Sequence, residues 1–224
     1  MDRNSFAKAT LVSDFDGTIV NVDTAQVALD LYADLKWKRI EEALERGEVS
    51  FEDSLRQEFA MIKVSQETIL EQLDRVTALR PNFAQLVNYC MSNDIQFIVA
   101  SGGFDFCIQH FLNRDGWLKF IKICAPKSQF TKNGYALTFP KKITPSSINF
   151  KDDLVRCEKM KGNRVFFVGD GVGDYPAAKE SDFAFAIKAS KLADLCRGGN
   201  VSHKEIDDFQ EVVDTLGGQF DECS

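Results

Sequence analysis

The sequence predicts an α/β protein: a parallel β-sheet with helices on both faces and a helical segment inserted after the first strand. Three short apolar runs, at 8–14, 95–103 and 164–171, lack strict alternation of apolar and polar residues. Such runs are typical of strands buried on both faces. Residues 22–79 show helical patterns and no convincing strand, which indicates the insert.

Helical patterns separate the apolar runs, as the connections between parallel strands require. Residues 82–93 and 151–160 carry apolar side chains at helical spacing and directly precede the second and third strands. A fourth apolar run, at 183–186, follows another short helical pattern. An Asn-Gly pair before an alternating segment predicts a small hairpin near 128–139.

The insert carries two helix start signals. Ser50 and Ser65 each stand just before a segment whose apolar residues recur at helical spacing. We therefore expect residues 22–79 to form a small helical cap. Residues 1–21 and 80–224 are expected to form the core domain.

Composition excludes several classes of protein. The 224 residues are 44% hydrophobic with a net charge of −7, so a sizeable core is possible and a nucleic-acid or anionic membrane surface is not expected. The first ten residues lack the apolar stretch of a signal peptide, and no run of 18 apolar residues could span a membrane. Six dispersed cysteines predict free thiols and a cytoplasmic location; a monomer and a homodimer both stay open.

Polar residues end three of the predicted strands. Asp14, Ser101 and Asp170 each come at the end of an apolar run, with glycine close by. In an open parallel sheet, ligands bind outside the carboxyl ends of the strands. These three side chains are therefore expected to meet at one binding site.

Two carboxylates, one residue apart, suit the hydrolysis of a phosphate monoester. Asp14 can attack phosphorus and form an aspartyl phosphate. Asp16 lies on the same side of an extended segment, so it can protonate the leaving group and later accept a proton from water. This reading predicts a small phosphorylated metabolite as the substrate.

Two anions facing an anionic substrate require positive charge. A hard divalent ion with oxygen ligands, Mg²⁺, fits best, and Asp170 and Asp174 supply further carboxylates. Ser101 and the amides of Gly102 and Gly103 can bind phosphate oxygens, and a lysine should add the remaining charge.

Three segments together resemble the motifs of the haloacid dehalogenase-like superfamily: "DFDGT", "VASGG" and "VGDGVGD". The resemblance implies a three-layer α/β/α, Rossmann-like core with a helical cap after the first strand. It also implies that Asp14 is the nucleophile and Asp16 the acid/base. By the same resemblance, Asp14, the main-chain carbonyl of Asp16 and Asp170 bind Mg²⁺, and Asp174 supports them.

The resemblance also implies a lysine in a third motif. Lys151 opens the helix before the 164–171 strand, where relatives similar to phosphoserine phosphatase carry this residue. It would act with Asp14, Asp16 and Ser101 in catalysis. Lys159 and Lys161 are the competing assignments.

The expected cap points toward two kinds of substrate. "GEVSFEDSLRQEF" resembles the cap of phosphoserine phosphatases, which implies that Arg56 binds a substrate carboxylate and that Asp23 faces an ammonium group. The segment from 169 to 186 instead resembles the diketo-methylthiopentane phosphate phosphatases and their fungal relatives that act on polyol phosphates. The substrate therefore stays open between these groups.

Three alternative interpretations compete with hydrolysis. An EF-hand counted from Asp14 would need glycine and glutamate where Ile19 and Ala25 stand. A phosphomutase or phosphotransferase would keep both acids and stays possible. A non-catalytic binding protein of the same fold is the alternative from another class, and the presence of Asp14 and Asp16 disfavours it.

Overall fold

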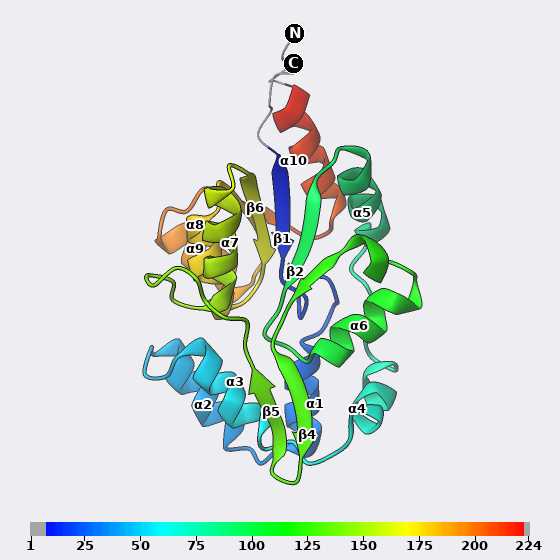
Figure 1. Ribbon diagram of the computed structural model, residues 1–224, viewed down its shortest axis with the longest axis vertical. Coiled ribbons are helices and arrows are strands. Elements are labelled where there is room, and N and C mark those ends of the chain that lie inside the picture. Colours follow the sequence, from blue (N-terminus) through cyan, green and yellow to red (C-terminus); the bar gives the residue numbers. More distant parts are fainter. Residues whose placement is uncertain (1–7, 222–224) are drawn as a thin grey trace.

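The computed structural model of the chain describes residues 8–221 (Figure 1). A six-stranded parallel sheet forms its centre, in the order β3-β2-β1-β6-β7-β8. The strands are β1 (Ala9–Ser13), β2 (Gln96–Ala100), β3 (Lys122–Cys124), β6 (Arg164–Gly169), β7 (Phe183–Ile187) and β8 (His203–Ile206).

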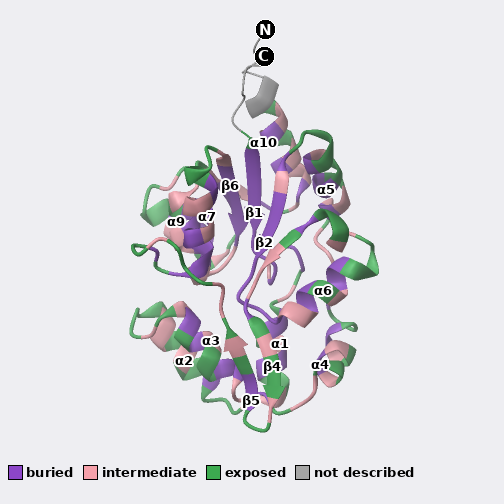
Figure 2. Ribbon diagram, in the orientation of Figure 1, coloured by how far each residue is buried: buried purple, intermediate pink, exposed green. Residues whose placement is uncertain are grey.

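Strand β1 lies between β2 and β6, so its backbone is paired on both edges. Val12 stands opposite Ile98 of β2 and opposite Phe167 of β6. All five residues of β1 are buried, which explains why the strand is apolar without alternation (Figure 2). The four strands expected from the apolar runs are confirmed.

Helices cover both faces of the sheet and make the predicted three layers. Leu11 packs in a cluster with apolar residues of α5, α6 and α10, whereas the next residue, Val12, packs with α7, α8 and α9. Neighbouring residues of a strand point to opposite faces, so the sheet separates the two clusters. These helices are α5 (Phe83–Ser92), α6 (Asp105–Arg114), α7 (Phe150–Met160), α8 (Tyr175–Glu180), α9 (Lys191–Gly198) and α10 (Gln210–Asp221).

A group of short helices lies beyond the carboxyl ends of the strands, at the bottom of Figure 1. Ser50 and Ser65 cap two of them, as expected, by accepting the amide N–H groups of Asp53 and Thr68. The helices are α1 (Thr24–Tyr32), α2 (Trp37–Glu45), α3 (Phe51–Phe59) and α4 (Gln66–Leu73). The exact division into core and cap stays a prediction.

The expected hairpin is present as β4 (Lys127–Thr131) and β5 (Gly134–Thr138), paired antiparallel. It lies beside the short helices at the bottom of Figure 1. The Tyr135 hydroxyl donates to the carbonyl of Val64, at 3.1 Å, in the loop between α3 and α4. The hairpin therefore packs with the helical group although it is distant from it in sequence.

No helix among residues 8–221 is long and apolar enough to cross a membrane. The cysteines within the same range are free, as expected; Cys223 lies outside the described residues. The cytoplasmic location stays a prediction.

Candidate active site

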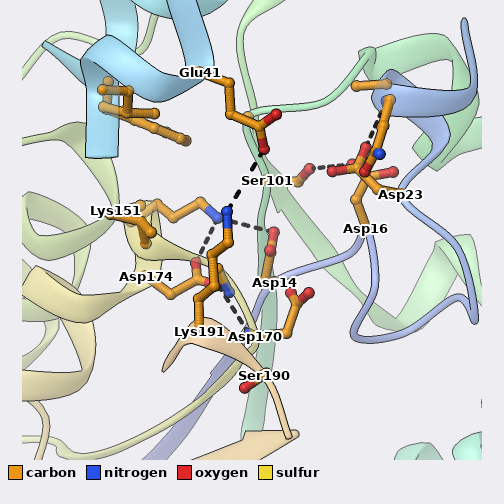
Figure 3. A pocket seen from close by; sticks show the side chains of 18 of the residues that line it. Asp14, Asp16, Asp23, Glu41, Ser101, Lys151, Asp170, Asp174, Ser190 and Lys191 are labelled. Atoms are coloured by element: carbon orange, nitrogen blue, oxygen red, sulfur yellow. Dashed lines mark hydrogen bonds and ion pairs between the residues drawn. The ribbon is translucent and has the colours of Figure 1, made fainter. Parts of the chain in front are cut away.

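A cavity of about 630 Å³ lies between the carboxyl ends of the strands and the helices α1–α3 (Figure 3). The loops after β1, β2 and β6 supply its floor. Residues of α1, α2 and α3 supply its opposite wall. The predicted side chains Asp14, Ser101 and Asp170 all line this cavity, so the structure brings the three strand ends together.

Asp14 and Lys151 form the centre of the floor. The Lys151 ammonium lies 2.9 Å from Oδ1 of Asp14 and 2.6 Å from Oδ1 of Asp174. Its side chain is only 3% exposed. The competing residues Lys159 and Lys161 pair elsewhere, with Asp182 and Glu158. Of the three lysines, Lys151 is the one placed beside Asp14.

Asp174 contacts both Lys151 and the backbone of the loop after β6. Its Oδ2 accepts the amide N–H groups of Asp170 and Gly171, both at 3.0 Å. Asp170 in turn accepts the hydroxyl of Thr18 at 3.0 Å, from the loop after β1. Oxygens of Asp14, Asp170 and Asp174 consequently lie within 4.8 Å of one another.

The carboxylates carry more negative charge than Lys151 can neutralise. Burial, with the charge of Asp174, raises the pKa of Asp14 well above its ordinary value, although Lys151 opposes the shift. Burial and Asp174 also raise the pKa of Asp170, to about 7. Three clustered carboxylate oxygens are the donor set that a hard divalent cation prefers, and such an ion would relieve this repulsion. The residues present therefore fit Mg²⁺.

Asp16 faces a different part of the cavity from Asp14 (Figure 3). Its Oδ1 accepts both the hydroxyl and the amide N–H of Thr24, the latter at 2.9 Å. Its Oδ2 accepts the Ser101 hydroxyl at 3.2 Å. Burial raises the pKa of Asp16, while these hydrogen bonds pull it down. The carboxyl is thus held in one orientation, apart from the three-carboxylate cluster.

The loop after β2 contains Ser101, Gly102 and Gly103, which were expected to bind phosphate. Ser101 lines the cavity, and its hydroxyl oxygen accepts the amide N–H of Gly103 at 2.9 Å. That amide therefore fixes Ser101 in this structure, whereas Gly102 lines the cavity directly. Phosphate binding by this loop stays a prediction.

The two residues expected to bind the leaving group, Asp23 and Arg56, line different cavities. Asp23 lines the cavity, and its carboxylate also caps α1 by accepting the Gln26 amide at 2.8 Å. Arg56 lines a second cleft, where it pairs with Asp53 at 2.8 Å and lies 4.6 Å from the ring centre of Phe139. The structure does not bring Arg56 to the cavity that holds Asp14.

The cavity is also lined by residues of α9 and α3 that were not expected from the sequence. Lys191, the first residue of α9, forms an ion pair with Glu45 and lies 3.9 Å from Glu41, both from α2. Phe51 also lines the cavity. No local pattern singles out these residues, because the contacts join segments far apart in the chain.

Comparison with protein families gives a match to the model of the haloacid dehalogenase-like hydrolases over residues 11–179. A "2-hydroxy-3-keto-5-methylthiopentenyl-1-phosphate phosphatase" from Brevibacillus brevis is 25% identical, over 93% of this chain and 95% of that protein. A protein of the same name from Bacillus pumilus is 27% identical, over 96% of this chain and 92% of that protein.

Solved structures share the fold. A structure titled "Phospho-Aspartyl Intermediate Analogue of Phosphoserine phosphatase" superposes with a TM-score of 0.69 at 19% identity, over 94% of this chain and 99% of that chain. A phosphoserine phosphatase from T. onnurineus gives 0.63 at 21% identity, over 96% and 97% of the two chains. At these identities, the likeness establishes the architecture alone.

Proposed function

Because this chain belongs to the haloacid dehalogenase-like hydrolase family, we propose that it is a phosphatase that hydrolyses small phosphomonoesters through an aspartyl phosphate. One observation carries the proposal. Asp14 lies beside Lys151 on the cavity floor, and the separately held Asp16 lines the same cavity. The site thus places a nucleophile, a cation and a second acid around one space.

In the first half of the proposed reaction, a carboxylate oxygen of Asp14 attacks phosphorus, and the bond from phosphorus to the ester oxygen breaks. Asp16, in its protonated form, gives its proton to the departing oxygen, so the alcohol leaves neutral. The raised pKa of Asp16 favours that protonated form. Lys151 and the Ser101 loop hold the phosphoryl oxygens.

In the second half, the ionised Asp16 accepts a proton from a water molecule as that water attacks phosphorus. The bond between phosphorus and Asp14 breaks, so inorganic phosphate leaves and both acids return to their starting states. Thr24 keeps the Asp16 carboxyl in place through both transfers by its two hydrogen bonds.

We propose that Asp14, Asp170 and Asp174 hold Mg²⁺, together with the main-chain carbonyl of Asp16. When bound, the ion neutralises charge on the phosphoryl group and on the carboxylates. The clustering of three carboxylate oxygens within 4.8 Å supports this assignment. Lys151 provides the positive charge that this chain itself contributes.

For the leaving group, we propose a small metabolite without a carboxylate. Asp23, just before α1, and Glu41 and Glu45 of α2 line the cavity, and Lys191 is already paired with the two glutamates. Like charges would repel a substrate carboxylate there, whereas hydroxyl groups could donate to these side chains. The names of the Brevibacillus and Bacillus relatives agree with such a substrate.

The experiment is a panel of phosphomonoesters assayed for phosphate release with Mg²⁺ and with EDTA. The panel contains polyol phosphates, a diketone phosphate, phosphoserine and an aryl phosphate. We expect turnover that requires Mg²⁺, and loss of several orders of magnitude in Asp14→Asn. A folded Asp14→Asn variant with near wild-type turnover would rule out the covalent mechanism.

A further inference from the structure

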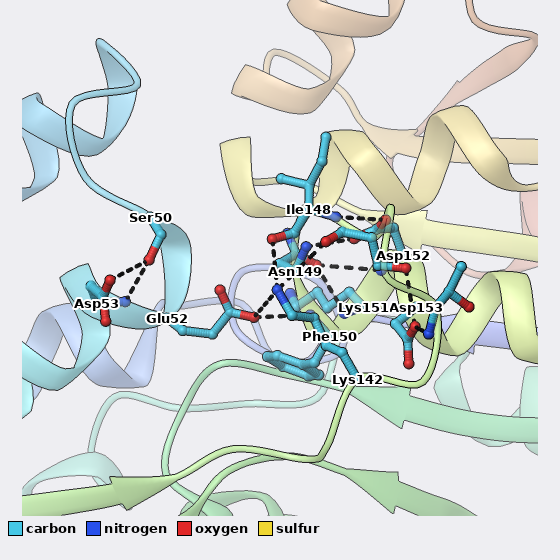
Figure 4. Close-up of polar contacts among 12 residues, drawn as sticks. Ser50, Glu52, Asp53, Lys142, Ile148, Asn149, Phe150, Lys151, Asp152 and Asp153 are labelled. Carbon is cyan, nitrogen blue, oxygen red and sulfur yellow. Dashed lines mark hydrogen bonds and ion pairs between the residues drawn. The ribbon is translucent and has the colours of Figure 1, made fainter.

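Glu52, on the first turn of α3, is buried against the first turn of α7 (Figure 4). The residue is only 8% exposed, although glutamate is seldom buried without a partner. Its Oε1 accepts the amide N–H of Phe150 at 3.1 Å. This bond joins residues 98 positions apart, and Lys151 is the next residue along α7.

The first turn of an α-helix has amide groups that no residue of the helix can satisfy. In α7, the Asn149 side chain accepts the amides of Lys151, at 2.8 Å, and Asp152, at 3.3 Å. The amide N–H of Phe150 instead donates to the carboxylate of Glu52. The cap of the Lys151 helix is therefore completed by a side-chain oxygen from another part of the chain.

Phe51, the residue before Glu52, also packs against the first turn of α7. Its ring stacks on Phe150, with centroids 6.2 Å apart, and its centre lies 5.5 Å from the Lys151 ammonium. The ring also fits against Gly102 and Gly173, where any β-carbon would clash with it. The start of α3 is thus seated directly on the loops that build the cavity floor.

We propose that Glu52 is a positioning residue, which sets the place of Lys151 by holding the first turn of α7 through the Phe150 amide. The inference rests on the proposed phosphatase function and adds a residue that acts through another one. Lys151 must reach both Asp14 and Asp174, so a displaced first turn weakens both contacts. The acceptor oxygen of Glu52, rather than its charge, carries this role.

A competing role would be an ion pair with Lys142, whose ammonium lies 3.9 Å from the same oxygen. Lys142 also donates to the carbonyls of Ser147 and Ile148, at 3.5 and 3.3 Å, so it has other partners. An ion pair needs the charge of Glu52, whereas the Phe150 amide needs only an acceptor. The two roles can be distinguished by one substitution that removes the charge of Glu52 but keeps its length, and another that keeps the charge but shortens the side chain.

The test compares Glu52→Gln, which keeps an acceptor of the same reach, with Glu52→Asp, which keeps the charge on a side chain one methylene shorter. We expect Glu52→Gln to retain kcat within about threefold. Glu52→Asp should lose about tenfold or more in kcat and weaken inhibition by vanadate to a similar extent. Glu71→Asp, on the exposed face of α4, is the matched control and should change neither quantity.

Hydrogen exchange of the Phe150 amide gives a readout that does not depend on turnover. It should accelerate at least tenfold in Glu52→Asp and stay slow in Glu52→Gln. Wild-type kcat in Glu52→Asp, or an equal loss of kcat in both variants, would overturn the inference. If the wild-type protein hydrolyses no ester in the panel, the proposed function fails, and the exchange comparison still decides whether Glu52 holds α7.

Discussion

Replacing Lys151 with methionine tests the electrostatics of the site, because it removes a buried cation and keeps most of the side-chain volume. Lys151 lies 2.9 Å from Asp14 and 2.6 Å from Asp174, and its side chain is 3% exposed. Lys151→Met leaves the cluster of Asp14, Asp170 and Asp174 without this neutralising charge. Breaking a buried ion pair on one side costs about 3–5 kcal/mol, since the remaining charges lose their partner.

For a chain of 150–250 residues, each kcal/mol corresponds to about 2–4 °C in Tm. In EDTA we therefore expect Lys151→Met to melt roughly 6–20 °C below the wild type. Mg²⁺ should raise the Tm of the variant more than that of the wild type, because a cation that binds only the folded state stabilises it. Turnover should fall by several orders of magnitude in both conditions.

The assay is thermal unfolding with EDTA and with a series of Mg²⁺ concentrations. Lys159→Met, on the same helix, removes an exposed ion pair with Asp182 and should cost at most about 1 kcal/mol. Equal stability of Lys151→Met and wild type in EDTA would show that the carboxylates are not held together by this charge. An identical response of both proteins to Mg²⁺ would contradict the assigned metal cluster.

Three further outcomes follow from the structure. Thr24→Val removes the hydroxyl donated to Asp16, and kcat should fall by about 10- to 100-fold with little change in Tm; an unchanged kcat would refute the role of that bond. Arg56→Ala should alter kcat/KM less than threefold across the ester panel, and a selective loss on phosphoserine would restore Arg56 as a carboxylate ligand. Burial and the charge of Glu41 raise the pKa of Glu58 from 4.5 to about 7, so stability should fall by up to about 3 kcal/mol as pH rises through that window. Asp170, whose pKa is also raised to about 7, contributes to the same slope, so Glu58→Gln should reduce the slope by the Glu58 share in urea unfolding at pH 5 and pH 8; the same slope in both proteins would assign it to other groups.

The strands that could be predicted from sequence are the ones buried on both faces. Strands β1, β2, β6 and β7 are continuous apolar runs because helices cover them on each side. The edge strands β3 and β8 were missed. They are three and four residues long, and most of their side chains are only partly buried, so neither leaves an apolar run in the sequence.

The same distinction applies to the site. Asp14, Asp16, Ser101 and Asp170 could be predicted because parallel strands bring their carboxyl ends to one edge, whatever the loops do. Thr24 could not, since its contact with Asp16 depends on how α1 begins after the loop. The ion pairs of Lys191 with α2 likewise depend on where the helical group sits, and local sequence does not encode that placement.

The packing of helix α3 determines which of its side chains face the cavity and which face the second cleft. Phe51 and Leu55, four residues apart, face the loop after β2, and Phe59 continues the same stripe into the core. Successive helical residues are about 100° apart around the axis, so Arg56 is turned away from the stripe and reaches the second cleft.

For Arg56 to reach the cavity, α3 would have to rotate by roughly that angle, which would withdraw Phe51 from the Lys151 ammonium and expose Phe59. It would also break the bond from Glu52 to the Phe150 amide. Each of these contacts opposes the rotation, and within residues 8–221 no arginine lines the cavity that holds Asp14. We therefore propose that Asp23 and the glutamates of α2, which accept hydrogen bonds and repel anions, contact the leaving group.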